Sequence, residues 1–325
     1  MMPVNKKAFR PRAYKILPAV SILTLAAFII IFPVEALEAA GESVKLWFNR
    51  ALPSLLPFMI GINILSAVGF TQDIGKWLAN FMKIFGVPGE GGVALAAGMS
   101  SGYPMGAKLT AQLRENGILT QTEAQRLLSF VNNSGPLFIL GTVGVGMFND
   151  KRVGYFLMLT HYSAAFITGL LFRTYSAAGE IETRRVVKRV PAAEDKPLGI
   201  VLSGSVMNAM ESMALIGGFI IFFGVLCKAV VMIPFFSRPF ASVLSGVFEM
   251  TNGLFLTHSA GLSLKARVLA AAALISFGGL SIHAQTISMI GKTDIKPSLY
   301  LLAKIVHGLI ALGITYALYP LLKVE

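Results

Sequence analysis

Long apolar stretches separated by short charged segments are the main pattern of the chain. They approach the length of a membrane-spanning helix at residues 16–34, 52–70, 120–148, 152–175, 206–233, 264–291 and 297–320. The hydrocarbon core of a bilayer is about 30 Å thick, so a spanning helix takes roughly 20 residues. The pattern therefore predicts an all-α, polytopic membrane protein with seven crossings.

Two further apolar stretches, 88–118 and 238–262, are interrupted in the middle by Gly, Pro, Ser and Asn. Each half has about ten residues, and a helix of that length reaches about 15 Å, half of the hydrocarbon core. Such a segment enters and leaves the membrane on one side, provided that protein or water satisfies its irregular backbone. We therefore expect two re-entrant helical hairpins.

The broken segments recur in the same order in two parts of the chain. The matching segments are Leu127–Ser134 with Leu274–Ser281, Ser101-Gly102 with Ser245-Gly246, and Ser54-Leu55 with Ser212-Met213. Each part has a spanning helix, a hairpin, a broken transmembrane helix and another span. Three crossings are an odd number, so the second part enters from the opposite face. The prediction is an inverted-topology repeat, whose paired breaks point to a transport site near the midplane.

This repeat divides the chain into four parts. They are 1–44 (basic N-terminus, first transmembrane helix and an external segment), 45–175 (first repeat), 176–198 (basic linker) and 199–325 (second repeat). Positive charge gathers near the N-terminus and in the linker, at Lys6, Lys7, Arg10, Arg12, Lys15, Arg184, Arg185, Lys188, Arg189 and Lys196. The positive-inside rule places both clusters in the cytoplasm and the C-terminus outside, although Lys265 and Arg267 then fall on the wrong side. The first apolar run resembles a signal peptide, but it exceeds the roughly 7–15 residues of a signal core, which favours a retained helix.

Composition supports a lipid environment. The chain of 325 residues is 55% hydrophobic and 14% charged, whereas soluble domains are roughly a quarter charged. The net charge of +12 lies mainly between apolar segments, so we expect no nucleic-acid partner. Cys227 is the single cysteine and the four histidines are far apart in sequence, which gives no support for a metal site. We expect no cofactor and leave a coupling Na⁺ or H⁺ open.

The tip of the first hairpin, Ser100–Lys108, is the first candidate for solute binding. Gly102 permits close backbone approach, and Pro104 suits the first turn of a new helix. The free N–H groups of such a helix start attract a carboxylate, and Lys108 adds a positive charge one turn later. Candidate residues are Ser100, Ser101, Gly102 and Lys108. The alternative is a tight turn whose lysine snorkels to the surface.

Polar residues also interrupt the apolar helix at Asn132–Pro136. Pro136 removes an intrahelical hydrogen bond, and two amides and a hydroxyl at membrane depth are costly unless they meet a ligand, water or another helix. We assign Asn132, Asn133 and Ser134 to the solute site. The alternative is a proline kink held by interhelical hydrogen bonds.

The second half has an equivalent tip and an equivalent break. A carboxylate at Glu249 is a functional hypothesis by default at membrane depth, and Thr251 and Asn252 follow it. Ser281 and Gln285 are four residues apart and share a helix face in the second break. Apolar segments contain further polar residues. Glu211 lies near a helix start, so it is a weaker candidate for the site than Glu249, and His283 is as readily explained by packing as by ligand binding. We expect Lys304 and His307 to form hydrogen bonds with neighbouring residues.

Three segments of the first half resemble a known family: Pro53–Phe58, Ser101–Lys108 and Phe130–Phe138. They resemble the YlbJ-type sporulation integral membrane proteins, a group with nucleoside-recognition (gate) domains. That group is similar to SpoVV-like dipicolinate transporters and, more distantly, to concentrative nucleoside transporters. The resemblance extends from about residue 45 to 320, and the tip Ser101–Lys108 is its most specific part.

The resemblance implies a protein of endospore formation, needed for the spore cortex and for moving dipicolinic acid towards the forespore, in the mother-cell-derived membrane around it. It carries over the tip at 101–108 and the break at 132–134. Helix N-termini, hydroxyls, amides and a lysine suit a planar dianion such as dipicolinate, and they equally suit a nucleoside. The expected partners are a small-molecule solute and the bilayer, with a homo-oligomer or other sporulation membrane proteins left open.

Two other classes of function compete with transport. An enzyme requires a nucleophile–base pair, an acid cluster or a metal set, and the sequence has none at a suitable spacing, so we expect no catalytic residues. A membrane scaffold for spore cortex assembly would have a dry interior, and its broken helices would matter only for folding. Solute accumulation in cells with and without the protein distinguishes a transporter from a scaffold.

Overall fold

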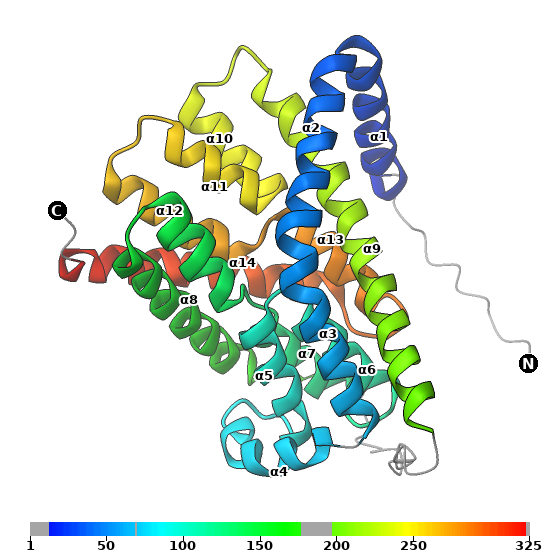
Figure 1. Ribbon diagram of the computed structural model, residues 1–325. Coiled ribbons are helices and arrows are strands. Elements are labelled where there is room, and N and C mark those ends of the chain that lie inside the picture. Colours follow the sequence, from blue (N-terminus) through cyan, green and yellow to red (C-terminus); the bar gives the residue numbers. More distant parts are fainter. Residues whose placement is uncertain (1–12, 69, 177–196, 323–325) are drawn as a thin grey trace, which may run out of the picture.

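The computed structural model describes residues 13–68, 70–176 and 197–322, and these residues form helices and no strands (Figure 1). The N-terminal basic residues up to Arg12, most of the basic linker and the side chain of Ser54 lie outside the described part. The helices are α1 (Ala13–Ile31), α2 (Pro33–Leu46), η1 (Trp47–Ala51), α3 (Leu52–Ala67), α4 (Phe70–Lys83), η2 (Gly89–Gly91), α5 (Gly92–Ser101), α6 (Met105–Glu115), α7 (Gln121–Val131), η3 (Leu137–Met147), α8 (Lys151–Phe172), α9 (Leu198–Val231), α10 (Arg238–Phe248), α11 (Met250–Ser259), α12 (Leu264–Phe277), α13 (Gly279–Ile290), α14 (Pro297–Leu318) and η5 (Tyr319–Leu321).

Some of these helices are long and apolar enough to cross a bilayer by themselves. Among the described residues they are Lys151–Phe172, Leu198–Val231, Leu264–Ile290 and Pro297–Leu321, and a pair bent by 114° after Ile31 adds a fifth candidate. The all-α, polytopic prediction is confirmed. The crossings expected at 52–70 and 120–148 coincide with the shorter helix α3 and with the broken pair α7 and η3, so they stay predictions.

The N-terminal part forms a helical hairpin at Pro33, where the chain reverses from α1 into α2 (Figure 1). A proline disfavours the helical conformation of the residue before it, and Phe32 has a non-helical ψ of 61°. From Pro33 the chain continues through α2, η1 and α3 along α9 (Figure 1). Residues 35–44, for which we expected an external segment after the first helix, lie within α2.

Both stretches expected as hairpins are pairs of short helices in contact. In the first, α5 and α6 are joined through Gly102, whose φ is +89°. A Cβ at Gly98 or Gly106 would lie 1.9 or 2.2 Å from the carbonyl oxygen of Val131, so both arms pack tightly against the end of α7. In the second, α10 and α11 pack so closely that a Cβ at Gly253 would lie 2.0 Å from Cα of Gly246.

The two halves contact each other in a reciprocal pattern. The first helices of the halves, α3 and α9, pack together, and so do the last helices, α8 and α14. The first part of each broken helix packs against the last helix of the other half, α7 on α14 and α12 on α8. Any two-fold arrangement of similar halves gives this pattern, so the inverted topology and the rotation that would superpose the halves stay predictions.

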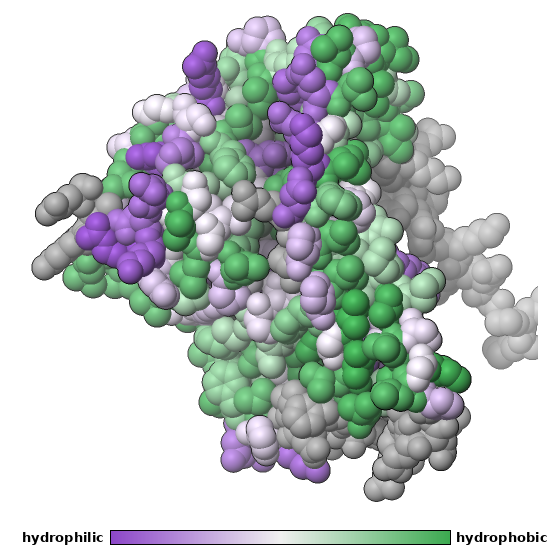
Figure 2. All heavy atoms as spheres, viewed as in Figure 1, coloured by the Kyte–Doolittle hydropathy of each residue, from purple (hydrophilic) through white to green (hydrophobic). Residues whose placement is uncertain are grey.

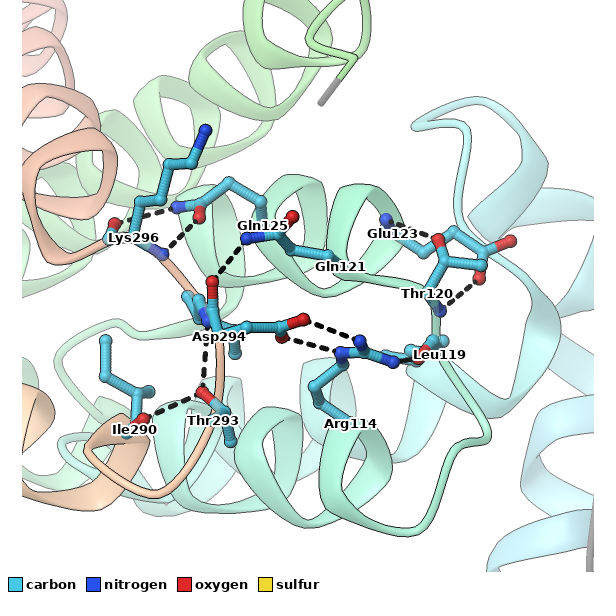
Figure 3. Close-up of polar contacts among 11 residues, drawn as sticks. Arg114, Leu119, Thr120, Gln121, Glu123, Gln125, Ile290, Thr293, Asp294 and Lys296 are labelled. Atoms are coloured by element: carbon cyan, nitrogen blue, oxygen red, sulfur yellow. Dashed lines mark hydrogen bonds and ion pairs between the residues drawn. The ribbon is translucent and has the colours of Figure 1, made fainter. Parts of the chain in front are cut away.

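Polar contacts at the ends of the helices follow the same pairing. Arg114 in the last turn of α6 forms a bidentate ion pair with Asp294, in the loop between α13 and α14, at 2.7 and 2.8 Å (Figure 3). Gln125 exchanges hydrogen bonds with the backbone of Lys296 beside it (Figure 3). In the other pairing, the guanidinium of Arg267, near the start of α12, lies 5.9 Å from the centre of the Phe148 ring, between η3 and α8.

Large apolar side chains cover much of the outer surface, as a lipid-facing protein requires (Figure 2). The interior contains apolar clusters as well as polar groups. Phe85 and Phe130 stack at 4.4 Å in the first half, and Leu274 and Ile275 belong to the core of the second. Polar side chains are buried mainly where hairpins and broken helices meet.

Candidate functional site

Each hairpin tip lies against the break in the following helix of its own half. In the first half, a Cβ at Gly102 would lie 2.6 Å from the backbone nitrogen of Gly135, so the tip touches the break after α7. In the second half, a Cβ at Gly279 would lie 3.1 Å from the backbone nitrogen of Met250, so the second tip touches the break between α12 and α13. Backbone that leaves the helical pattern is therefore gathered inside the protein.

Tyr103 connects the first tip to the second half. Its hydroxyl donates a hydrogen bond to the carbonyl oxygen of Ile275 at 3.2 Å, just before the second break. Gly278 sits beside the same ring, where its φ of +95° and a 3.2 Å approach of the tyrosine oxygen to a hypothetical Cβ both favour glycine. The first tip thus touches both breaks.

Asn132 begins a buried polar network at the first break. Its Nδ2 donates to Thr286 Oγ1 at 2.8 Å and to the Tyr300 hydroxyl at 3.2 Å. The Tyr300 hydroxyl also lies 3.1 Å from Nδ1 of His283. One amide of the first half therefore joins two helices of the second.

Lys304 lies at the centre of this network and is 1% exposed. Its Nζ donates to the backbone carbonyl of Asn132 and lies 3.0 Å from Nδ1 of His307. The nitrogen also lies 5.0 Å from the centre of the Tyr103 ring. No ion pair of the described residues includes Lys304. A lysine at membrane depth without a carboxylate partner is unusual, because an unpaired buried charge is strongly unfavourable.

His161 on α8 links the two breaks from the other side. The backbone N–H of Ser134 donates to its Nε2 at 3.2 Å. Nε2 is then an acceptor, so Nδ1 carries the proton and donates to Ser276 Oγ at 2.8 Å. This histidine holds the first break and the end of α12 at a fixed separation.

Several buried polar atoms around the tip and the break have no hydrogen-bond partner. They are Ser101 Oγ, Asn132 Oδ1, Asn133 Oδ1 and His283 Nε2. Native proteins leave few such atoms, because each costs roughly 1–3 kcal/mol when unsatisfied. Asn132 and His283 belong to the same network as Lys304. The four atoms are groups with which a polar ligand would find partners.

Some of the expected site residues of the first half lie at the first break, and others lie away from it. Asn132, Asn133 and Ser134 are buried at the break, where Asn133 Nδ2 donates to its own helix at Phe130. Ser100 is exposed and bonds within α5. Lys108 is 9% exposed and donates to Ser212 Oγ on α9 at 2.9 Å, so its contacts lie away from the break.

The second tip is built around a buried carboxylate. Glu249 accepts hydrogen bonds from the backbone N–H groups of Thr251 and Asn252 at 3.1 and 2.7 Å, and thereby caps α11. In the second break, Gln285 donates to Ser281 Oγ at 3.4 Å. The structure therefore explains the acid as a helix cap, and the glutamine and serine as a local pair.

Sequence reasoning gave too little weight to the residues that converge on the first break. Lys304 and His307 do bond to neighbours, as expected, but these neighbours are the backbone of the break and each other. Two histidines that are far apart in sequence come together: the ring centres of His161 and His307 lie 4.8 Å apart. The available signal was a lysine and a histidine three residues apart in an apolar span. Among the described residues no three His, Cys, Asp or Glu side chains form a metal-binding group.

Comparisons with known proteins agree with this architecture. The Gate family, described as nucleoside recognition, matches residues 48–176, which contain the first hairpin and the first break. The sporulation integral membrane protein YlbJ of Bacillus subtilis (strain 168) is 34% identical over 322 aligned residues, which cover 89% of this chain and 79% of that protein. The chain belongs to the YlbJ family of sporulation integral membrane proteins. No solved structure matches it. The resemblance to the YlbJ-type proteins is therefore confirmed, and the protein is an integral membrane protein with a nucleoside-recognition gate domain.

Proposed function

We propose that this protein carries a small anionic solute across the membrane, and that the solute is dipicolinic acid during endospore formation. The observation that supports the proposal most is Lys304, a buried amine at the meeting point of hairpin tip and helix break, with no carboxylate beside it in the described residues. A solute carboxylate would supply the missing negative charge. Membership of a sporulation family supports the physiological setting, in the membrane around the forespore and in support of the spore cortex.

The surrounding groups suit a flat aromatic dicarboxylate. Lys304 provides a charged donor, and charge-assisted hydrogen bonds are about twice as strong as neutral ones. The unpaired hydroxyl of Ser101 provides a second donor at the tip. The ring face of Tyr103 lies 5.0 Å from Nζ of Lys304. These groups bind and orient a solute, and we assign no catalytic role to any of them.

The broken helices provide the means to move the solute. In transporters built from paired discontinuous helices, the solute site lies at the breaks, and one repeat moves against the other to open it alternately to each side. Movement of the first hairpin relative to the second half, through Tyr103 and Gly278, would open the site alternately to each side.

A nucleoside is the second candidate, because the family description that matches residues 48–176 is nucleoside recognition. The unpaired amide oxygens of Asn132 and Asn133 are acceptors that a base or a ribose hydroxyl would use. A nucleoside has no need of a buried lysine without a counter-charge, which is why we favour the anion.

Uptake by liposomes that contain the purified protein tests the proposal. Radiolabelled dipicolinate, uridine and neutral dipicolinamide should be compared at equal amounts of folded protein. We expect dipicolinate to accumulate and dipicolinamide, which has the same shape without charge, to stay near the level of empty liposomes. Accumulation of uridine alone would favour the nucleoside, and accumulation of none would reject transport of these solutes.

A further inference from the structure

The contacts of His307 determine where its protons lie. Nε2 of His307 lies 3.0 Å from the carbonyl oxygen of His161, and Nδ1 lies 3.0 Å from Lys304 Nζ. A carbonyl oxygen only accepts, so Nε2 carries a proton and donates it there. Nδ1 of the neutral ring is then an acceptor for Lys304.

This arrangement limits the Lys304–His307 pair to one positive charge. If Nδ1 also carried a proton, Lys304 would have to be a neutral amine to accept it. Two cations at 3.0 Å, both buried, would repel each other strongly. The pair is therefore either neutral or singly protonated, with one positive charge shared by Lys304 Nζ and His307 Nδ1.

A count of hydrogens separates these two states. A neutral amine has two hydrogens, and the carbonyl oxygen of Asn132 and Nδ1 of His307 accept both. An ammonium has a third N–H, for which the described residues provide no further hydrogen-bond acceptor, only the ring face of Tyr103 at 5.0 Å. The neutral pair is satisfied by the protein alone, whereas the charged pair has one donor left for a ligand.

We propose that the Lys304–His307 pair binds a proton that travels together with the anionic solute. The inference rests on the proposed function and adds the coupling ion to it. The neutral pair takes up one proton from water on the side where the solute enters, and the new ammonium N–H donates to a solute carboxylate. When the solute leaves on the other side, the same proton returns to water and the pair is neutral again. An N–H bond forms as an O–H bond of hydronium breaks, and the reverse transfer to water on the other side restores the neutral pair.

The groups around the pair fit this cycle. The titratable side chains that face it are His161 from α8, Tyr103 from the first tip, Tyr300 from α14 and His283 from α13. None of them is a carboxylate. Without a solute no side chain in the described part of the chain supplies a counter-charge to the pair, so protonation and solute binding favour each other, as linkage requires.

The experiment uses the full-length protein in liposomes that contain a pH-sensitive dye, with the membrane potential held at zero. Adding dipicolinate outside at equal pH should acidify the interior of wild-type liposomes as labelled solute enters. A gradient of one pH unit, acid outside, should raise the final accumulation about tenfold for one proton per solute. His307→Gln should remove the effect of the gradient on accumulation, and His258→Gln, a matched change on α11 outside the network, should keep it.

Different results would overturn the proton coupling and the transport of dipicolinate. Dipicolinate uptake that ignores the gradient, without acidification, would overturn the coupling and leave the transport proposal intact. Failure of uptake under every gradient would overturn both. Acidification that persists in His307→Gln would remove the pair from the coupling. A second readout requires no variant: dipicolinate adjusted to the same pH, added to wild-type protein in weakly buffered detergent, should make the medium more alkaline as protons are bound. An unchanged pH would overturn the proposal.

Discussion

Two buried lysines offer a direct test of where the anion binds. Lys304 contacts the first break and has no partner among the described residues that would neutralise its charge, whereas Lys108 donates to Ser212 on α9. A hydrogen bond to a charged group contributes about 1.5–3 kcal/mol, or roughly ten- to 150-fold in affinity. We expect Lys304→Met to weaken dipicolinate binding by at least that lower factor and Lys108→Met to change it less than about threefold.

Stability must be measured on the same samples, because both changes remove buried hydrogen bonds. Lys304→Met leaves the carbonyl of Asn132 and Nδ1 of His307 without a donor, while Ser212 keeps its own bond to Asn208 when Lys108 is replaced. Each orphaned acceptor costs roughly 1–3 kcal/mol, so Lys304→Met should also melt at a lower temperature. Calorimetric titration on the folded fraction gives the affinity. Wild-type affinity in Lys304→Met, or a greater loss in Lys108→Met, would refute the reasoning.

Three further predictions concern packing and charge. Gly98→Ala places a methyl 1.9 Å from a carbonyl oxygen, so overpacking should cost about 1–3 kcal/mol and lower the melting temperature in detergent. Asn132→Ala loses two hydrogen bonds between the halves and should destabilise by about 1.2 kcal/mol at 0.6 each, while Asn133→Ala loses one local bond and should mainly reduce uptake per folded molecule. Hydrogen bonds from Arg114 hold the pKa of the Asp294 carboxyl below its usual value, so this ion pair stabilises the fold above about pH 4 and is lost as the pH falls through the lowered pKa. In melting curves between about pH 3 and 6, the melting temperature of Asp294→Asn should fall less with decreasing pH than that of the wild type.

Apolar patterning was enough to predict the long helices α8, α9 and α14, but not α4, which lies between the stretches expected as a crossing and as a hairpin. The two broken stretches were visible because glycine, proline and polar residues interrupt apolar sequence, and both are hairpins in the structure. The reversal at Pro33 was missed, because a proline after a long apolar run is also compatible with the end of a spanning helix and an external segment. The π-helical segment η3 was not predictable either, since its residues differ little from those of an α-helix.

Site residues were harder to predict, because the network forms between distant segments. The break at Asn132 was marked by its own sequence, but its partners Thr286 and Tyr300 are ordinary residues of later helices. Lys108 stood out because it follows the tip, yet helix rotation directs it to α9. Lys304 stood out less, although a charged residue inside a span is a functional hypothesis by default.

Labelling of a single cysteine at the first tip tests most directly whether solute reaches the meeting point of tip and break. Cys227 is buried and is the only cysteine of the chain, so Cys227→Ser combined with Ser101→Cys gives one reporter thiol at the tip. In liposomes we expect a membrane-impermeant thiol reagent to label this position, dipicolinate to slow the labelling and dipicolinamide to leave it unchanged. Wild-type protein, with its buried thiol, should remain unlabelled. A reporter that stays unlabelled in protein that still transports, or is labelled at the same rate with and without dipicolinate, would contradict a solute site between the tip and the break.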